Sequence, residues 1–90
     1  MTEPNIEAMF LTLCEADPTI RAAFDNAVAL LLRGQRKRDK AIMRSAGSAF
    51  ARLCDRFGIA QGFPVDEPTR RVLLELVGRT VLIRGSAPLN

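Results

Sequence analysis

Apolar residues recur along most of this chain at the three- and four-residue spacing that is typical of amphipathic helices. Residues 36–57 show this spacing most clearly, because one side of a helix there would be almost wholly apolar. The residues on that side are Ile42, Met43, Ala46, Phe50, Leu53, Cys54 and Phe57. Residues 4–15 and 18–33 repeat the spacing. The pattern therefore predicts three amphipathic helices in the first two thirds of the chain.

Proline, aspartate and glycine mark where these helices are expected to begin and end. Aspartate caps exposed amides and proline is tolerated in a first turn, so three helix starts are expected. They are Pro4, the pair Asp17–Pro18, and Asp66 with Pro68. The expected stops are three glycines that follow apolar segments, Gly34, Gly58 and Gly85. The predicted helices are residues 4–15, 18–33, 36–57 and 67–84, with a loop, GIAQGFPVD, at residues 58–66.

Residues 18–57 are not expected to form one long helix. The apolar stripe shifts in phase by roughly 60° across Gly34. An unbroken helix over this range would also span about 60 Å, which is too long for so small a domain. We therefore predict a tight helical hairpin around Gly34.

The last segment, PTRRVLLELVGRTVLIRG, favours a helix, although its end also has the β-branched residues of a short strand. Arg71, Glu75 and Arg79 are spaced four residues apart and would form a ladder of ion pairs on a helix. A strand would need a partner strand, and no other segment supplies one. We expect an all-α bundle of about four helices in a single domain, residues 1–90, whose last helix could end in a short strand.

Apolar residues on this fourth helix cover more of its circumference than a peripheral helix needs. A second copy of the chain is the simplest cover, since two-fold homodimers are the commonest soluble assembly. The alternative is that the same surface docks a different protein. The residues expected to bind the partner are Leu73, Leu74, Val77, Val81 and Leu82.

Five consecutive small residues, from Ser45 to Ala49, lie inside the third predicted helix. Glycine in a helix costs about 0.5–1 kcal/mol relative to alanine, so Gly47 needs a reason. Small side chains let another backbone come close. The run therefore predicts a close helix crossing, either within the chain or with a partner.

Charge is divided unevenly along the chain, with a net charge of −4 over residues 1–32, +6 over residues 33–56 and +1 over residues 57–90. The basic cluster centres on RGQRKRDK, and its members are Arg33, Arg36, Lys37, Arg38, Lys40 and Arg44. Four of them, Arg33, Lys37, Lys40 and Arg44, are expected to form a row opposite the apolar side of the third helix. Three interpretations remain open: a solvated helix face, a site for an acidic protein, and a phosphate-binding surface for nucleic acid.

The composition weighs against catalysis, metals and cofactors. The chain has no His, Tyr or Trp, which removes the commonest general base, the commonest metal ligand and the best stacking side chains. The carboxylates fall on polar helix faces, no glycine-rich phosphate loop is present, and Cys14 with Cys54 cannot complete a zinc site. A helix-turn-helix motif is excluded, because two prolines fall in the segment that would have to form its recognition helix. We expect no enzyme, no metal and no cofactor.

The two cysteines are expected to be reduced, small apolar residues. The N-terminal residues are acidic and do not resemble a secretory leader, and the longest apolar run, AVALLL, is too short to span a membrane. Together these features predict a cytoplasmic, non-enzymatic regulator or adaptor that binds protein as a homodimer. It would act, for example, by inhibiting or sequestering a larger protein such as a transcription regulator. The alternative is a nucleic-acid-associated module that uses the basic cluster.

Overall fold

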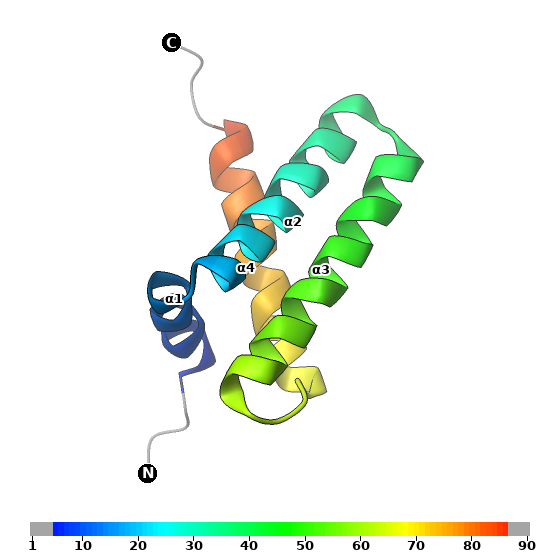
Figure 1. The fold of residues 1–90 in the computed structure, drawn as a ribbon. Coiled ribbons are helices and arrows are strands. Elements are labelled where there is room, and N and C mark those ends of the chain that lie inside the picture. Colours follow the sequence, from blue (N-terminus) through cyan, green and yellow to red (C-terminus); the bar gives the residue numbers. More distant parts are fainter. Residues whose placement is uncertain (1–4, 87–90) are drawn as a thin grey trace.

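The computed structural model describes residues 5–86, which form four α-helices and no strand (Figure 1). The helices are α1 (Ile6–Ala16), α2 (Pro18–Lys37), α3 (Lys40–Gln61) and α4 (Glu67–Ser86). The prediction of an all-α bundle of four helices is confirmed, and residues 79–84 are helix, not strand. Pro4, the expected start of the first helix, lies outside the described residues.

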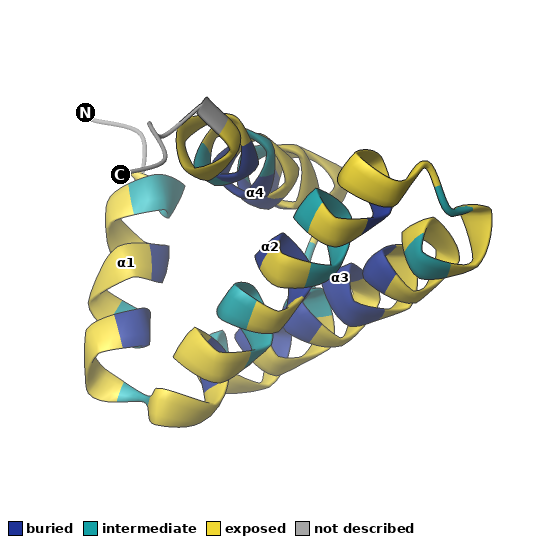
Figure 2. Ribbon diagram, turned by 90° about the horizontal axis from the view of Figure 1, so that it is seen from above, coloured by how far each residue is buried: buried dark blue, intermediate teal, exposed yellow. Residues whose placement is uncertain are grey.

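The second helix lies at the centre of the bundle. α2 and α3 form the predicted antiparallel hairpin and pack along most of their length, while α1 and α4 also pack against α2. α3 and α4 touch one another little. Seen from above, the buried positions of all four helices face the middle of the molecule (Figure 2). The largest fully buried side chains are Phe10, Phe57, Ile20, Leu53, Leu73 and Val28.

Each helix begins at a polar cap. The side chains of Asn5, Asp17 and Asp39 accept hydrogen bonds from backbone amides in the first turns of α1, α2 and α3. At α4, the Thr69 amide donates to Oδ1 of Asp66 over 2.9 Å. The starts expected at Asp17 and Asp66 are confirmed. The cap at Asp39 was not expected, because this residue was counted only as part of a charged run.

The expected helix stops at Gly34, Gly58 and Gly85 are wrong, since all three glycines lie inside helices. α2 ends at Lys37 and is capped by Arg38, with a left-handed φ of 51°, and α3 ends at Gln61 and is capped by Gly62, with a φ of 91°. Gly34 and Gly58 serve close packing instead. A Cβ at Gly34 would lie 2.7 Å from Sδ of Met43, and one at Gly58 would lie 3.2 Å from the carbonyl oxygen of Phe63.

The predicted ladder on the fourth helix also differs. Arg71 pairs with Glu67 over 3.9 Å, and Arg79 reaches Glu7 of α1 over 3.2 Å. Near the other end of α4, Arg84 lies 3.5 Å from Asp25 of α2. Ion pairs therefore join α4 to both α1 and α2.

The run of small residues in α3 does not form a close crossing at its glycine. Ala46 and Ala49 are buried in the core, whereas Ser45, Gly47 and Ser48 are exposed. A Cβ at Gly47 would meet no atom within 4 Å. Close contacts lie instead at Gly34, against the side chains of Met43 and Ile42, and at Gly58, against the backbone of residues 63–65.

Candidate functional site

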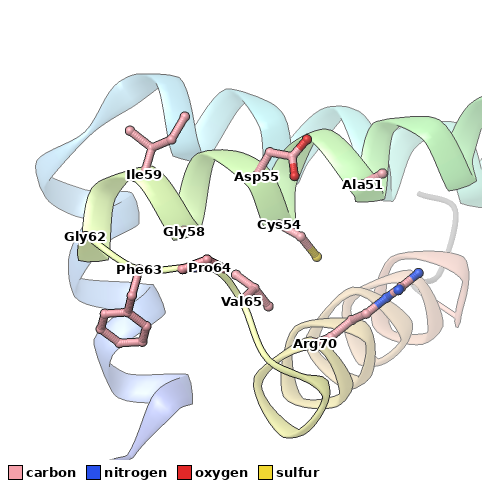
Figure 3. A pocket seen from close by; sticks show the side chains of 10 residues that line it. All are labelled: Ala51, Cys54, Asp55, Gly58, Ile59, Gly62, Phe63, Pro64, Val65 and Arg70. Carbon is pink, nitrogen blue, oxygen red and sulfur yellow. The ribbon is translucent and has the colours of Figure 1, made fainter.

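A groove of about 800 Å³ lies between the C-terminal half of α3, the loop at residues 62–66 and the start of α4 (Figure 3). Side chains of α3, of the loop and of the first turn of α4 line the same hollow. The lining residues are Ala51, Cys54, Asp55, Gly58, Ile59, Gly62, Phe63, Pro64, Val65 and Arg70.

The loop that closes one end of the groove is held against α3 by backbone hydrogen bonds. The amides of Gly62 and Phe63 both donate to the carbonyl oxygen of Gly58, over 3.0 and 3.2 Å. The side-chain amide of Gln61 donates to the carbonyl oxygen of Phe63 over 3.0 Å. Because Gly58 has no Cβ, the loop can pass this close to the helix. The wall of the groove is thus a fixed part of the fold.

Cys54 brings the one thiol that lines this groove. Figure 3 shows its sulfur and the guanidinium of Arg70 on the side where α3 faces α4. Burial raises the pKa of the Cys54 thiol, the positive charge of Arg70 opposes this, and the carboxylate of Asp55 adds to it. The protonated thiol, a poor nucleophile, is therefore the main form at neutral pH.

Cys14 has the same character. It lies in the core, and burial raises its pKa as well. Cys14 and Cys54 are both free thiols, as expected of small apolar residues. In the described part of the chain, no group of three His, Cys, Asp or Glu residues could hold a metal ion.

The loop end of the groove carries two exposed apolar side chains. Ile59 is 79% exposed and Phe63 is 57% exposed. Sequence reasoning missed both as surface residues of interest. A hint of exposed apolar residues was present in GIAQGFPVD, where Ile59 and Phe63 each follow a glycine. The groove itself could not be predicted, because it depends on how the loop packs on α3.

The five residues predicted to bind a partner through the fourth helix divide into two groups. Leu73, Val77 and Val81 are at most 3% exposed and belong to the protein's own core, so they are not available to a partner. Leu74 and Leu82 are 54% and 69% exposed and lie on the outer face. One part of the wide apolar surface of this helix therefore packs in the core, and the other part is exposed to solvent.

The six predicted basic residues are all exposed, but the four expected in a row on the third helix lie on two helices. Arg33, Arg36 and Lys37 belong to the end of α2, Arg38 lies in the turn, and Lys40 and Arg44 belong to the start of α3. The structure gathers them at the tip of the hairpin. This placement corrects the expected helix boundary at residues 34–36.

Comparisons with protein-family models, with curated proteins and with solved structures find no match for this chain. None of the helices in the described range is long and apolar enough to cross a membrane.

Proposed function

We propose that this protein is a non-enzymatic, cytoplasmic regulator or adaptor that acts by binding protein, and that it does so as a homodimer. The observation that carries the proposal is the outer face of α4. This face keeps large apolar side chains in solvent although its opposite face already fills the core. Large apolar side chains gathered on one outer helix face are a feature of association surfaces.

The exposed residues Leu74 and Leu82 of α4, with the half-buried Gly78 between them, are spaced for a helix pair. Leu74, Gly78 and Leu82 are four residues apart and so lie along one side of the helix. We call these three residues the α4 stripe. A Cβ at Gly78 would meet no atom within 4 Å, so the stripe has a shallow gap at its middle, between the two leucines. A two-fold axis through this gap would place Leu74 of one copy opposite Leu82 of the other. The stripe is therefore complementary to itself, as a two-fold interface requires.

The groove beside α3 is the proposed surface for the larger protein that the dimer regulates. Its apolar wall at Ile59 and Phe63 suits the apolar face of an amphipathic helix. Arg70 at the rim would meet an acidic residue of that helix. This part of the proposal rests on the lining of the groove and is secondary to the dimer.

Size exclusion with light scattering tests the dimer. We expect a mass of two chains at micromolar concentration, and we expect Leu74→Arg or Leu82→Arg to raise the dissociation constant at least tenfold. The matched control is Leu11→Arg, because Leu11 is 48% exposed but lies on α1. This control should leave the dimer intact. A monomer mass at every concentration up to about 100 µM would contradict the proposal.

A further inference from the structure

The tip of the α2–α3 hairpin is the most strongly charged surface of the described chain. It consists of Arg33, Arg36, Lys37, Arg38, Lys40 and Arg44, which we call the basic tip. Figure 1 shows the hairpin extending beyond the rest of the bundle, with its tip away from α1. A partner can therefore reach these side chains from several directions.

None of the basic-tip side chains is neutralised within the described residues. The ion pairs of the described residues are formed by Arg21, Arg71, Arg79 and Arg84, and all four arginines lie outside the tip. The single acid among residues 33–44 is Asp39, so this stretch has a net charge of +5. The Asp39 carboxylate accepts hydrogen bonds from the amides of Ala41 and Ile42. It caps α3 in place of pairing with the cations.

The acidic part of the chain lies far from the basic tip. Glu15 and Asp17 stand where α1 meets α2, at the opposite end of α2. A helix of the length of α2 rises about 30 Å. Charges at that distance are well beyond the screening length of about 8 Å at physiological salt. The acidic residues around the α1–α2 junction therefore do not offset the positive potential at the tip.

The backbone at Arg38 gives a second observation. Its left-handed φ of 51° is a conformation in which glycine would be less strained. An arginine here extends the cluster across the turn, so the positive charge continues from α2 into α3. The chain thus has a cation at the one position of the tip where backbone geometry alone would favour glycine.

We propose that the basic tip binds the phosphate backbone of duplex nucleic acid without reading its sequence. This function is independent of the dimer. A protein interface of ordinary affinity has a desolvated apolar or aromatic centre, and the tip has only Met43, 38% exposed, beside it. Single strands need aromatic side chains for stacking, and none of the chain's five phenylalanines lies within residues 33–44. Phosphate contacts need only exposed cations.

Salt dependence is the signature of this kind of binding. Each phosphate that a cation neutralises on B-form DNA contributes about −0.9 to the slope of log K against log salt. If four to six side chains of the tip engage, the slope should lie at about −4 to −5. Duplex RNA presents the same phosphate chemistry, so it belongs in the same experiment.

The test is fluorescence anisotropy with labelled 24-base-pair duplexes of DNA and of RNA, between 50 and 200 mM KCl. The variant is the triple substitution Arg36→Ala, Lys37→Ala and Arg38→Ala. Loss of three contacts should make the slope for DNA less steep by about 2.7 and weaken binding at 50 mM salt at least tenfold. The thermal midpoint should stay nearly unchanged, because these side chains are exposed.

The matched control is the triple substitution Arg52→Ala, Arg56→Ala and Arg71→Ala. It lowers the net charge from +3 to zero, as the first triple does, but removes exposed arginines outside the tip. Binding close to that of the unaltered protein would support the tip as the site. Equal losses in both triples, or no binding to either duplex at 50 mM salt, would overturn the proposal. Tighter binding to a polyglutamate peptide than to both duplexes would overturn it in favour of an acidic protein.

Discussion

At the scale of single residues, the backbone of Arg38 decides how the α2–α3 hairpin turns. Its amide donates to the carbonyl oxygen of Gly34, and its left-handed conformation directs the chain toward Asp39. A residue with a Cβ pays about 1–2 kcal/mol for this conformation. Folding stability therefore favours glycine at this position, whereas the positive charge of the tip favours arginine.

We expect Arg38→Gly to raise the free energy of unfolding by about 0.5–1 kcal/mol, part of the relieved strain being offset by the greater freedom of glycine in the unfolded chain. Urea denaturation measures this change. The control is Lys37→Gly, which lies in the last turn of α2 and should lower the free energy of unfolding instead. If both variants are destabilised alike, Arg38 carries no strain.

The contrast between Leu73 and Leu74 shows how far a sequence determines the role of one residue. Both were expected on a partner surface, yet Leu73 is fully buried and Leu74 is half exposed. Periodicity shows that apolar residues cover a wide arc of the fourth helix, but it does not show which part of that arc faces the core. That choice depends on where α2 and α1 pack.

At the scale of helices and loops, the glycines of α3 have opposite roles. Gly47 faces open space, whereas Gly58 lies under the loop that forms the wall of the groove. A methyl group at Gly47 would add helix propensity without a clash. The same group at Gly58 would push against the backbone of residues 63–65.

Gly47→Ala is therefore expected to raise the free energy of unfolding by about 0.5–1 kcal/mol. Gly58→Ala is expected to lower it by about 1 kcal/mol, because close-packed backbone must move. Thermal and urea denaturation of the two variants make the comparison, and each variant serves as the control for the other. Stabilisation by Gly58→Ala would mean that the loop is not held against α3.

The starts of α2 and α4 could be predicted from the sequence, whereas the start of α3 and the ends of α2 and α3 could not. Asp17 and Asp66 cap helices through local hydrogen bonds, which the neighbouring sequence encodes. The ends depend on long-range packing: Gly34 was expected as a stop, but α2 continues to Lys37 and uses the missing side chain to admit Met43. The groove could not be predicted for the same reason, since it forms where the loop after Gln61 returns over Gly58.

At the scale of the whole molecule, one core joins all four helices. Phe10 of α1 packs its ring against Phe24 of α2 and Phe57 of α3, with centroids 5.4 and 5.7 Å apart. Phe50 and Leu53, which lie on the predicted apolar side of the third helix, are buried in the same cluster. Loss of one large side chain should therefore weaken the entire fold and not one helix.

Phe50→Ala is expected to cost about 3–5 kcal/mol, a large share of the stability of a domain of this size. Unfolding should remain a single transition with a much lower denaturant midpoint. The control is Ser48→Ala on the exposed side of α3, with an expected change within about 0.5 kcal/mol. A midpoint close to that of the unaltered protein would show that Phe50 is not part of the core.

The separation of acidic and basic residues along α2 also gives the molecule an electric dipole. The negative pole lies at the junction of α1 and α2, with Glu15 and Asp17, and the positive pole at the hairpin tip, at opposite ends of a helix that rises about 30 Å. In the field of a polyanion such a molecule experiences a torque before it makes contact, so encounters should begin tip first more often than random tumbling allows. Added salt shortens the range of that torque. The charge arrangement would thus set the speed and orientation of approach as well as the strength of binding.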